Sequence, residues 1–341
     1  MAFSVARWPR RSLRLLAPAR LRSLAMARRQ MLRSLSTLRQ DYSRLGYSSP
    51  MDCFSSAEAR ALRASLADSA TALNALSATA AATRSGGDGL AEAFSGSRRL
   101  KPHLLFPFLH DVAVERRIVD AVVVATGWPA ALLWESSFFI KEARDPGFVT
   151  WHQDDYFWGL TSAHVCTAWV AFTDSTIANG CLRIIPGTHD RGHFRHDESR
   201  PDHTAEKGAE SEEGANIGNN MLSRGQVADF ADDAVAARQE EVCLELGAGQ
   251  FSLHHGRLLH SSQPNDTCSP RVGLALRFIA PDVAPAGGEL TDYATLARGP
   301  DTCGHWLPEG RPAAPCDREA LALHTKATGI RMASFAAAEP Y

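Results

Sequence analysis

The chain has 341 residues, of which 45% are hydrophobic and 22% charged, and this composition is typical of a globular protein that can bury a core. Its seven cysteines form no Cys-x-x-Cys pair, which argues against a zinc finger and against a secreted disulfide framework. No apolar run approaches the length that spans a bilayer, so an integral membrane anchor is not expected.

The formal net charge of -2 hides an uneven distribution of charge along the chain. Residues 1–40 contain ten arginines and neither Asp nor Glu, whereas the rest of the chain has 26 basic against 38 acidic side chains. Phosphate binding needs clustered Lys and Arg. An acidic body of this kind therefore makes nucleic acid an unexpected partner, and a small-molecule substrate is expected instead. Nothing in the sequence fixes the oligomeric state.

The arginine-rich segment is also rich in Ser and Leu, and as a helix it would place Leu24, Met31 and Leu35 opposite its arginines. An Arg-rich, Ser-rich and acid-poor N-terminus is typical of an organelle transit peptide, so residues 1–40 are predicted to be one. The mitochondrion is preferred over the plastid. The alternative is a basic tail that contacts anionic membrane, in which case a cytoplasmic protein is expected.

Helices are predicted for residues 41–130, which would pack on the domain that follows. Ser56 is a candidate cap for a helix that begins in the stretch 55–67, and residues 110–127 show the apolar spacing of a second helix. Between them, the Ala/Ser/Gly-rich stretch 69–96 is predicted to be the end of a helix and a connection.

From residue 131 onward the sequence changes to short apolar or alternating runs separated by Gly, Pro, Asn and Asp. These runs are residues 132–141, 148–154, 164–173, 181–186, 243–246, 250–253 and 271–279. Many short strands at this spacing indicate a β-sandwich or barrel with helices beside it. The expected catalytic core is 131–285, interrupted by a polar insertion at 190–240 that is a candidate lid. Residues 286–341 are expected to be irregular, with one short helix near 319–327.

His152 and Asp154 are the first candidates for metal binding. In a strand, residues i and i+2 point to the same face, so the imidazole and the carboxylate would project together. His260, far downstream, can reach the same interior from another strand. Two histidines and one carboxylate on one face of an octahedral metal form the triad of non-haem Fe(II) oxygenases. This triad leaves three positions open, two for a bidentate 2-oxo acid and one for O2.

Arg271 follows His260 by eleven residues and begins a run in which Arg271, Gly273, Ala275 and Arg277 share one strand face. Two arginines separated by two very small residues are an unusual choice for a packed core, but they fit the border of a small anionic ligand. The remote carboxylate of 2-oxoglutarate needs a bidentate cation, and Arg has that geometry. For Arg277 two roles stay open, contact with the substrate or an ion pair inside the fold.

The motifs around these residues resemble those of the phytanoyl-CoA dioxygenase (PhyH) family. They are Trp151-His152-Gln153-Asp154, Thr167-Ala168-Trp169, the stretch from Asn179 to His189 and the stretch from His254 to Asn265. The likeness extends from about Gly46 to Ala327. It implies an α+β fold that is mainly β, a double-stranded β-helix (a jelly-roll or cupin-like barrel) flanked by helices.

The resemblance also implies roles for individual residues. His152, Asp154 and His260 would ligate Fe(II), and Arg271 would pair with the distal carboxylate of 2-oxoglutarate. Trp169 would lie against this cosubstrate, Ser262 would add a hydrogen bond near Arg271, and Ser137 would be a further contact. His254 and His255 are predicted to support the site without binding the metal.

The implied reaction is hydroxylation of an unactivated carbon of a small or medium organic molecule, with consumption of O2 and release of succinate and CO2. A non-haem iron halogenase is one alternative, but halogenating relatives have Ala or Gly where this chain has Asp154. A non-catalytic jelly-roll binding protein is another, and the intact ligand set argues against it. Zinc hydrolysis would leave Arg271 without a purpose.

Overall fold

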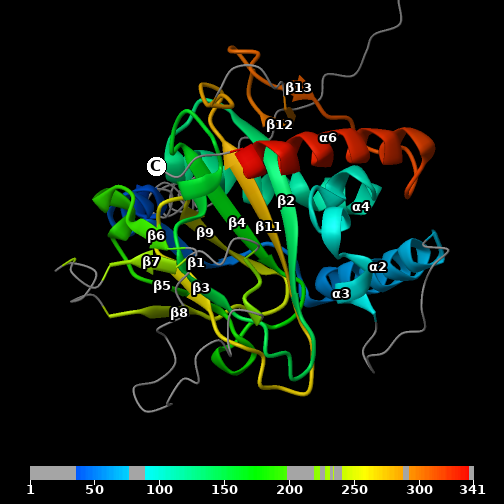
Figure 1. The fold of residues 1–341 in the computed structure, drawn as a ribbon, viewed down its shortest axis with the longest axis horizontal. Helices are drawn as coiled ribbons and strands as arrows, with labels where there is room; N and C mark the ends of the chain where they lie inside the picture. Colours follow the sequence, from blue (N-terminus) through cyan, green and yellow to red (C-terminus); the bar gives the residue numbers. More distant parts are fainter. Residues whose placement is uncertain are drawn as a thin grey trace, which may run out of the picture.

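Two facing sheets, antiparallel except for one parallel pair of strands, form the body of the protein (Figure 1). The computed structural model describes residues 36–76, 89–197, 219–222, 227–230, 233, 240–286 and 292–337. The larger sheet has seven strands in the order β1-β9-β4-β11-β2-β12-β13 and the smaller has four in the order β3-β10-β5-β8. Residues of both sheets line one cavity between them. This is the helix-flanked double-stranded β-helix that the sequence predicts.

The strands of the larger sheet are β1 (Tyr47–Asp52), β9 (Gln250–His255), β4 (Val165–Ala171), β11 (Arg271–Ile279), β2 (Ala131–Lys141), β12 (Tyr293–Arg298) and β13 (Leu307–Pro308). Those of the smaller sheet are β3 (Val149–His152), β10 (His260–Ser262), β5 (Leu182–Ile184) and β8 (Val242–Leu244). The α-helices with defined bounds are α2 (Ser56–Leu76), α3 (Leu90–Ala93), α4 (Pro107–Ala113), α5 (Arg116–Thr126) and α6 (Arg318–Ala337).

Strand β11 is buried along its whole length, because both of its faces lie against other parts of the protein. Its even-numbered residues, from Val272 to Phe278, belong to the main hydrophobic core together with residues of α2, α4 and α5. Its odd-numbered residues face the smaller sheet, and Arg271, Ala275 and Arg277 line the cavity there. The alternation of a strand thus separates the structural core from the polar interior.

The N-terminal helices differ from the prediction in their boundaries. The residue that caps α2 is Ser55, not Ser56: its hydroxyl accepts a hydrogen bond from the Glu58 amide (3.3 Å), and the Glu58 carboxylate accepts one from the Ser55 amide (2.7 Å). The single helix expected over 110–127 is instead the pair α4 and α5. The break has a physical cause, since the Glu115 carboxylate caps α5 by accepting from the Arg117 amide (3.2 Å).

The C-terminal part of the chain is more regular than expected. Strand β12 pairs with β2 in the larger sheet, and the short helix expected near 319–327 is the twenty-residue α6. Most of the predicted transit peptide, residues 1–35, lies outside the described residues, as does most of the 190–240 insertion. Within the described part of that insertion, β6 (Arg195–Asp197) pairs with β7 (Val227–Asp229).

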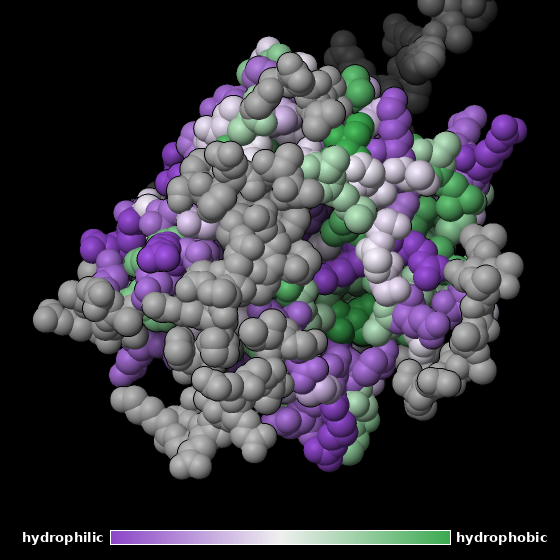
Figure 2. All heavy atoms as spheres, viewed as in Figure 1, coloured by the Kyte–Doolittle hydropathy of each residue, from purple (hydrophilic) through white to green (hydrophobic). Residues whose placement is uncertain are grey.

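On the side shown in Figure 2, hydrophobic and hydrophilic side chains of the described residues lie next to one another. Among the helices that the structure describes, none is both long enough and apolar enough to cross a membrane.

A buried ion pair between Lys101 and Glu309 joins the N-terminal region to the C-terminal part of the chain. Lys101 Nζ donates to Glu309 Oε1 (2.6 Å) and to the Tyr293 carbonyl (2.7 Å). Glu309 Oε2 accepts from Thr295 Oγ1 (2.8 Å) and lies 3.0 Å from His103 Nε2. Burial on its own would raise the pKa of Glu309, but the Lys101 ammonium and His103 lower it to about 2.

Replacing Glu309 by Gln should lower the free energy of unfolding by about 3 kcal/mol or more, because the Lys101 ammonium would stay buried without its counter-charge. Urea denaturation at pH 7 measures this. A free Glu has a pKa of about 4.3, so the contribution of Glu309 is complete above that pH and is lost as the pH falls toward the folded-state pKa of about 2. The exposed Glu319→Gln is the control, with an expected change below about 0.5 kcal/mol. Equal effects of the two changes would contradict the prediction.

Candidate metal centre and cosubstrate site

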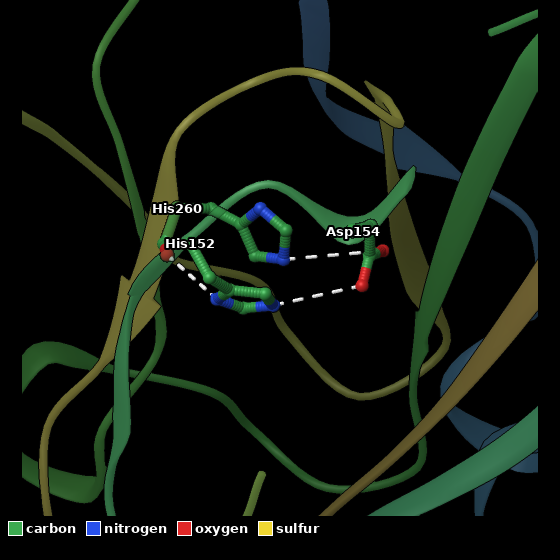
Figure 3. A group of neighbouring side chains, drawn as sticks. All are labelled: His152, Asp154 and His260. Atoms are coloured by element: carbon green, nitrogen blue, oxygen red, sulfur yellow. Dashed lines mark hydrogen bonds and ion pairs between the residues drawn. The ribbon is translucent and has the colours of Figure 1, made fainter. Parts of the chain in front are cut away.

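His152, Asp154 and His260 converge on one point inside the barrel (Figure 3). One ligand atom of each lies within 4.8 Å of the others. His260 on β10 is the cross-strand partner of His152 on β3, and their ring centroids are 4.1 Å apart. Asp154 oxygens lie 3.5 Å from His152 Nε2 and 4.0 Å from His260 Nε2. The three predicted ligands are therefore brought together at the spacing that one metal ion requires.

Asp154 reaches this point in a way that the sequence does not predict. Strand β3 ends at His152, and Asp154 is the first residue of the 3-10 helix η3 (Asp154–Phe157), so strand alternation does not place it. The buried Gln153 holds the turn: its amide nitrogen donates to the carbonyls of Gly192 and Arg257, both at 2.8 Å. Its backbone N–H donates to His196 Nε2 (2.9 Å). Gln153 is thus the residue that presents the carboxylate to the metal position.

Hydrogen bonds determine which nitrogen of each histidine can bind a metal. His152 Nδ1 lies 2.9 Å from the Thr150 carbonyl, and His260 Nδ1 lies 2.8 Å from the Leu258 carbonyl. A carbonyl only accepts, so each Nδ1 carries a proton, and Nε2 is the nitrogen of each ring that faces the site. Burial, and then the proximity of His152, lower the pKa of His260 well below its ordinary value, which keeps this imidazole neutral. Neutral imidazoles are the form that ligates a metal.

Asp154 is held in its ionised form. Burial alone would raise the pKa of this carboxyl, but the charge of Arg277 and the interactions with His152 and His254 keep it well below its usual range. Arg277 Nη2 lies 3.6 Å from Asp154 Oδ1, and His254 Nε2 lies 3.9 Å from Oδ2. Two neutral imidazoles and one carboxylate are the donor set of the facial triad, so these residues fit Fe(II).

Arg271 offers a second charged position in the same cavity. Its side chain is buried, Nη1 donates to the Gly180 carbonyl (2.7 Å), and Nε has no hydrogen-bond partner among the described residues. No carboxylate in the described part of the chain forms an ion pair with it. Burial lowers the pKa of Arg271 to about 10, so the guanidinium remains charged at neutral pH. A buried cation with an open donor is suited to bind an anion. The distal carboxylate of 2-oxoglutarate is such an anion.

Trp169 and Ser262 lie beside Arg271 and line the same cavity. The Arg271 guanidinium stands 5.3 Å from the centre of the Trp169 ring. A Cβ on Gly273 would lie 1.9 Å from Trp169 Cζ2, so only glycine leaves room for the indole. Ser262 Oγ donates to the Gly180 carbonyl (2.8 Å), next to the Arg271 contact. Gly273 of the sequence pattern therefore makes space for Trp169, and the contact of this indole with 2-oxoglutarate stays a prediction.

Ser137 lies apart from these predicted contacts. It does not line the cavity of the metal ligands; its hydroxyl accepts a hydrogen bond from Arg277 Nη1 (2.7 Å) and borders a neighbouring cavity. Arg277 itself pairs with Glu135 (2.8 Å) and lines both cavities, so both roles left open for it have support in the geometry. The contact of Ser137 with 2-oxoglutarate stays a prediction.

Lys141 is a residue of this region to which the sequence pattern assigned no role. It is fully buried at the end of β2, directly opposite Arg271 on β11. Its Nζ donates to Ser262 Oγ (2.7 Å) and to the Gln263 carbonyl. Burial, and then the charge of Arg271, lower the pKa of Lys141 to about 6. The available signal was a lysine that directly follows the apolar run Phe138, Phe139 and Ile140. His254, expected to support the site, lines the cavity beside Asp154.

A jelly roll whose interior joins two histidines, one carboxylate and a buried arginine defines the class of non-haem Fe(II), 2-oxoglutarate-dependent enzymes. The sequence model of the family "Phytanoyl-CoA dioxygenase (PhyH)" matches residues 42–273, and the chain belongs to this family. The resemblance seen in the sequence is therefore confirmed. Family membership and the ligand set together support Fe(II) and 2-oxoglutarate as its cofactor and cosubstrate.

Individual relatives agree with the family assignment. A phytanoyl-CoA dioxygenase domain-containing protein 1 homolog from Dictyostelium discoideum is 29% identical over 180 residues, which are 53% of this chain and 57% of that protein. A probable alpha-ketoglutarate-dependent hypophosphite dioxygenase from Stutzerimonas stutzeri is 26% identical over 197 residues, 57% of this chain and 62% of that protein. The chain thus spans little more than half the length of these curated relatives.

Among solved structures, the non-heme monooxygenase ThoJ in its apo form is 29% identical to this chain. The superposition covers 88% of this chain and 97% of ThoJ, with a TM-score of 0.68. The likeness therefore includes the parts of the chain that flank the matched family region.

Replacing Lys141 by Met should weaken the binding of 2-oxoglutarate by about tenfold, because the Ser262 hydroxyl would lose its donor and the anion would lose a nearby amine that can gain a proton when the anion binds. Titration calorimetry of protein loaded with Ni(II) in place of Fe(II) measures this affinity. Metal affinity should stay unchanged, since Lys141 contacts none of the three ligands. The exposed Lys326→Met is the matched control. An unchanged 2-oxoglutarate affinity in Lys141→Met would show that this lysine is structural only.

Proposed function

We propose that this chain is an Fe(II)- and 2-oxoglutarate-dependent dioxygenase that hydroxylates an unactivated carbon of a small or medium organic substrate. The observation that carries the proposal is the convergence of the Asp154 carboxylate with the Nε2 atoms of His152 and His260 inside the barrel. The similarity to the monooxygenase ThoJ supports oxygen insertion. Solved structures of the same fold also include the epimerase SnoN (20% identity, TM-score 0.50) and the carbocyclase SnoK (19%, 0.51). At this identity they concern the fold alone.

One set of residues in the site is placed to bind the metal, and another is placed to bind the cosubstrate. His152, Asp154 and His260 would hold the metal through two imidazole nitrogens and one carboxylate. Arg271, with Ser262 beside it, holds the distal carboxylate, while Trp169 confines the cosubstrate between the sheets. When bound, iron with 2-oxoglutarate and O2 supplies the oxidising chemistry, and 2-oxoglutarate becomes succinate and CO2. The protein contributes position and the exclusion of water, since all three ligands lie inside the barrel.

A second cavity next to the metal centre gives room for a substrate. It has a volume of about 410 Å³, within the usual range for organic ligands, and Asp154, Arg277 and Phe139 line both it and the metal cavity. A molecule in this space would therefore have one part beside the metal. This adjacency favours an enzyme over a non-catalytic binding protein.

Asp154 also separates hydroxylation from halogen transfer. A halide needs a coordination position, and here the carboxylate occupies it. Product analysis in the presence of chloride distinguishes the two reactions: we expect a product 16 Da heavier than the substrate and no chlorinated product.

Asp154→Ala should lower succinate formation from 2-oxoglutarate and Fe(II) by about 100-fold or more, because it removes a metal ligand, whose loss costs more than that of a supporting residue. The assay is the release of succinate under air, with and without a mixture of candidate substrates. Asp155→Asn is the matched control: Asp155 belongs to the same turn but pairs with Arg257 (3.1 Å) and His193 (3.2 Å), away from the cavity. No succinate from the wild-type protein under any of these conditions would overturn the proposal.

A further inference from the structure

We propose that the cavity beside the metal centre selects a substrate with an apolar body and an anionic oxygen group, a carboxylate or a phosphate, which Arg99 binds. This inference rests on the proposed function, because it names the substrate class of that same site.

Elements distant in the sequence enclose the cavity. The 3-10 helix η1 (Gly96–Arg99) contributes Arg99, β2 contributes Glu135 and Phe139, and α6 contributes Arg331 and Met332. Asp154 forms part of the wall on the side of the metal. A ligand that contacts both Arg99 and this wall is therefore held at two points, with its reactive carbon between them.

Arg99 is bound only to neutral groups. Its Nε donates to the Phe138 carbonyl (2.9 Å) and its Nη1 to the Met221 carbonyl (3.2 Å). The guanidinium carbon stands 4.4 Å from the centre of the Phe139 ring. Within the described residues, no carboxylate forms an ion pair with it. These contacts fix the guanidinium in place and leave its charge uncompensated.

The carboxylates that line the cavity are already engaged. Glu135 accepts from Arg277 Nη1 (2.8 Å) through one oxygen and from Arg331 Nε (2.6 Å) through the other. Asp154 is a metal ligand. Burial, and then the charge of Arg277, lower the pKa of Arg99 only to about 10, so it stays protonated at neutral pH. An anionic group on the substrate would supply the charge that neither carboxylate can give.

The remaining walls of the cavity are apolar and adaptable. Phe139, Trp158, Met221, Leu222 and Met332 line it, and Met332 is 53% exposed. Aromatic rings and flexible methionines accommodate hydrocarbon or aryl groups of varied shape. The combination of one fixed cation with apolar walls fits an organic acid better than a sugar or a polyamine.

The test is direct binding of simple probes to the full chain loaded with Ni(II) and 2-oxoglutarate, which prevents turnover. The probes are 4-phenylbutanoate, 3-phenylpropyl phosphate and the neutral 4-phenylbutanamide, followed by tryptophan fluorescence because Trp158 lines the cavity. The wild-type protein should bind at least one anion about tenfold more tightly than the amide. The tighter of the two anions identifies the group that the site prefers.

Variants then assign the preference to Arg99. Arg99→Gln should abolish it, and Arg99→Lys, which keeps the charge, should keep part of it. Arg98→Gln is the matched control, since Arg98 is in the same turn but donates to the Leu73 and Glu92 carbonyls (3.4 Å each) and does not line the cavity. Arg98→Gln should therefore bind like the wild type.

Three results would overturn the inference: equal binding of anion and amide, an equal loss of both in Arg99→Gln, or no binding of any probe. The assay does not depend on turnover. If the wild-type protein forms succinate but binds the anions and the amide equally, this inference alone is refuted. Charge-selective binding without succinate formation would refute the proposed function alone.

Discussion

The position of Arg277 is the constraint on which the interior of this protein depends. Its guanidinium pairs with Glu135 at 2.8 Å, donates to Ser137 at 2.7 Å and lies 3.6 Å from Asp154. Burying these charges between two sheets is costly unless each has a partner. Arg277 is the partner both of Asp154, the predicted metal ligand, and of Glu135, which lines the second cavity. Moving this guanidinium would therefore disturb the metal centre and the substrate cavity at the same time.

Charge in this interior is balanced in stages. Arg277 and Arg331 balance the charges of Glu135 and Asp154 within the protein, whereas Arg271 has an open donor that faces the predicted cosubstrate position. Lys141, whose pKa burial lowers to about 6, adds a group that can gain charge when an anion arrives nearby. Without its ligands, the protein thus has an excess of positive charge near Arg271, and a bound anion would neutralise it. Such preorganised charge is what gives a buried site its affinity for small anions.

The sequence predicted the parts of this site that follow from spacing. The alternation Arg271, Gly273, Ala275, Arg277 is the face that lines the cavity, and the far histidine His260 is the cross-strand neighbour of His152. The barrel was predictable from two signals. Turn residues separate the short apolar runs, and the long motifs resemble those of the PhyH family.

Other features depend on contacts between distant segments, which no local pattern encodes. The turn that presents Asp154 is held by Gln153 through carbonyls at Gly192 and Arg257, and Lys141 acquires its surroundings only when β2 meets β11. Strand β12 was missed because its outer half is exposed, which removes the buried alternation that identifies a strand. Ser55 and Ser56 are equivalent in composition, and only the reciprocal bonds with Glu58 distinguish the cap.

The helix α6 adds a consequence for how such enzymes diversify. It supplies Arg331 and Met332 to the cavity, yet the region matched by the family ends at Gly273, well before it. The three metal-ligand candidates and Arg271 lie inside the shared region, and one wall of the proposed substrate cavity lies outside it. Under the proposed function, mutations at Met332 in α6 would change which molecule is accepted while leaving the three metal-ligand candidates and Arg271 in place. Enzymes with this division can evolve new substrates while they keep one reaction. The name of such a family then describes the shared reaction and not the substrate of each member.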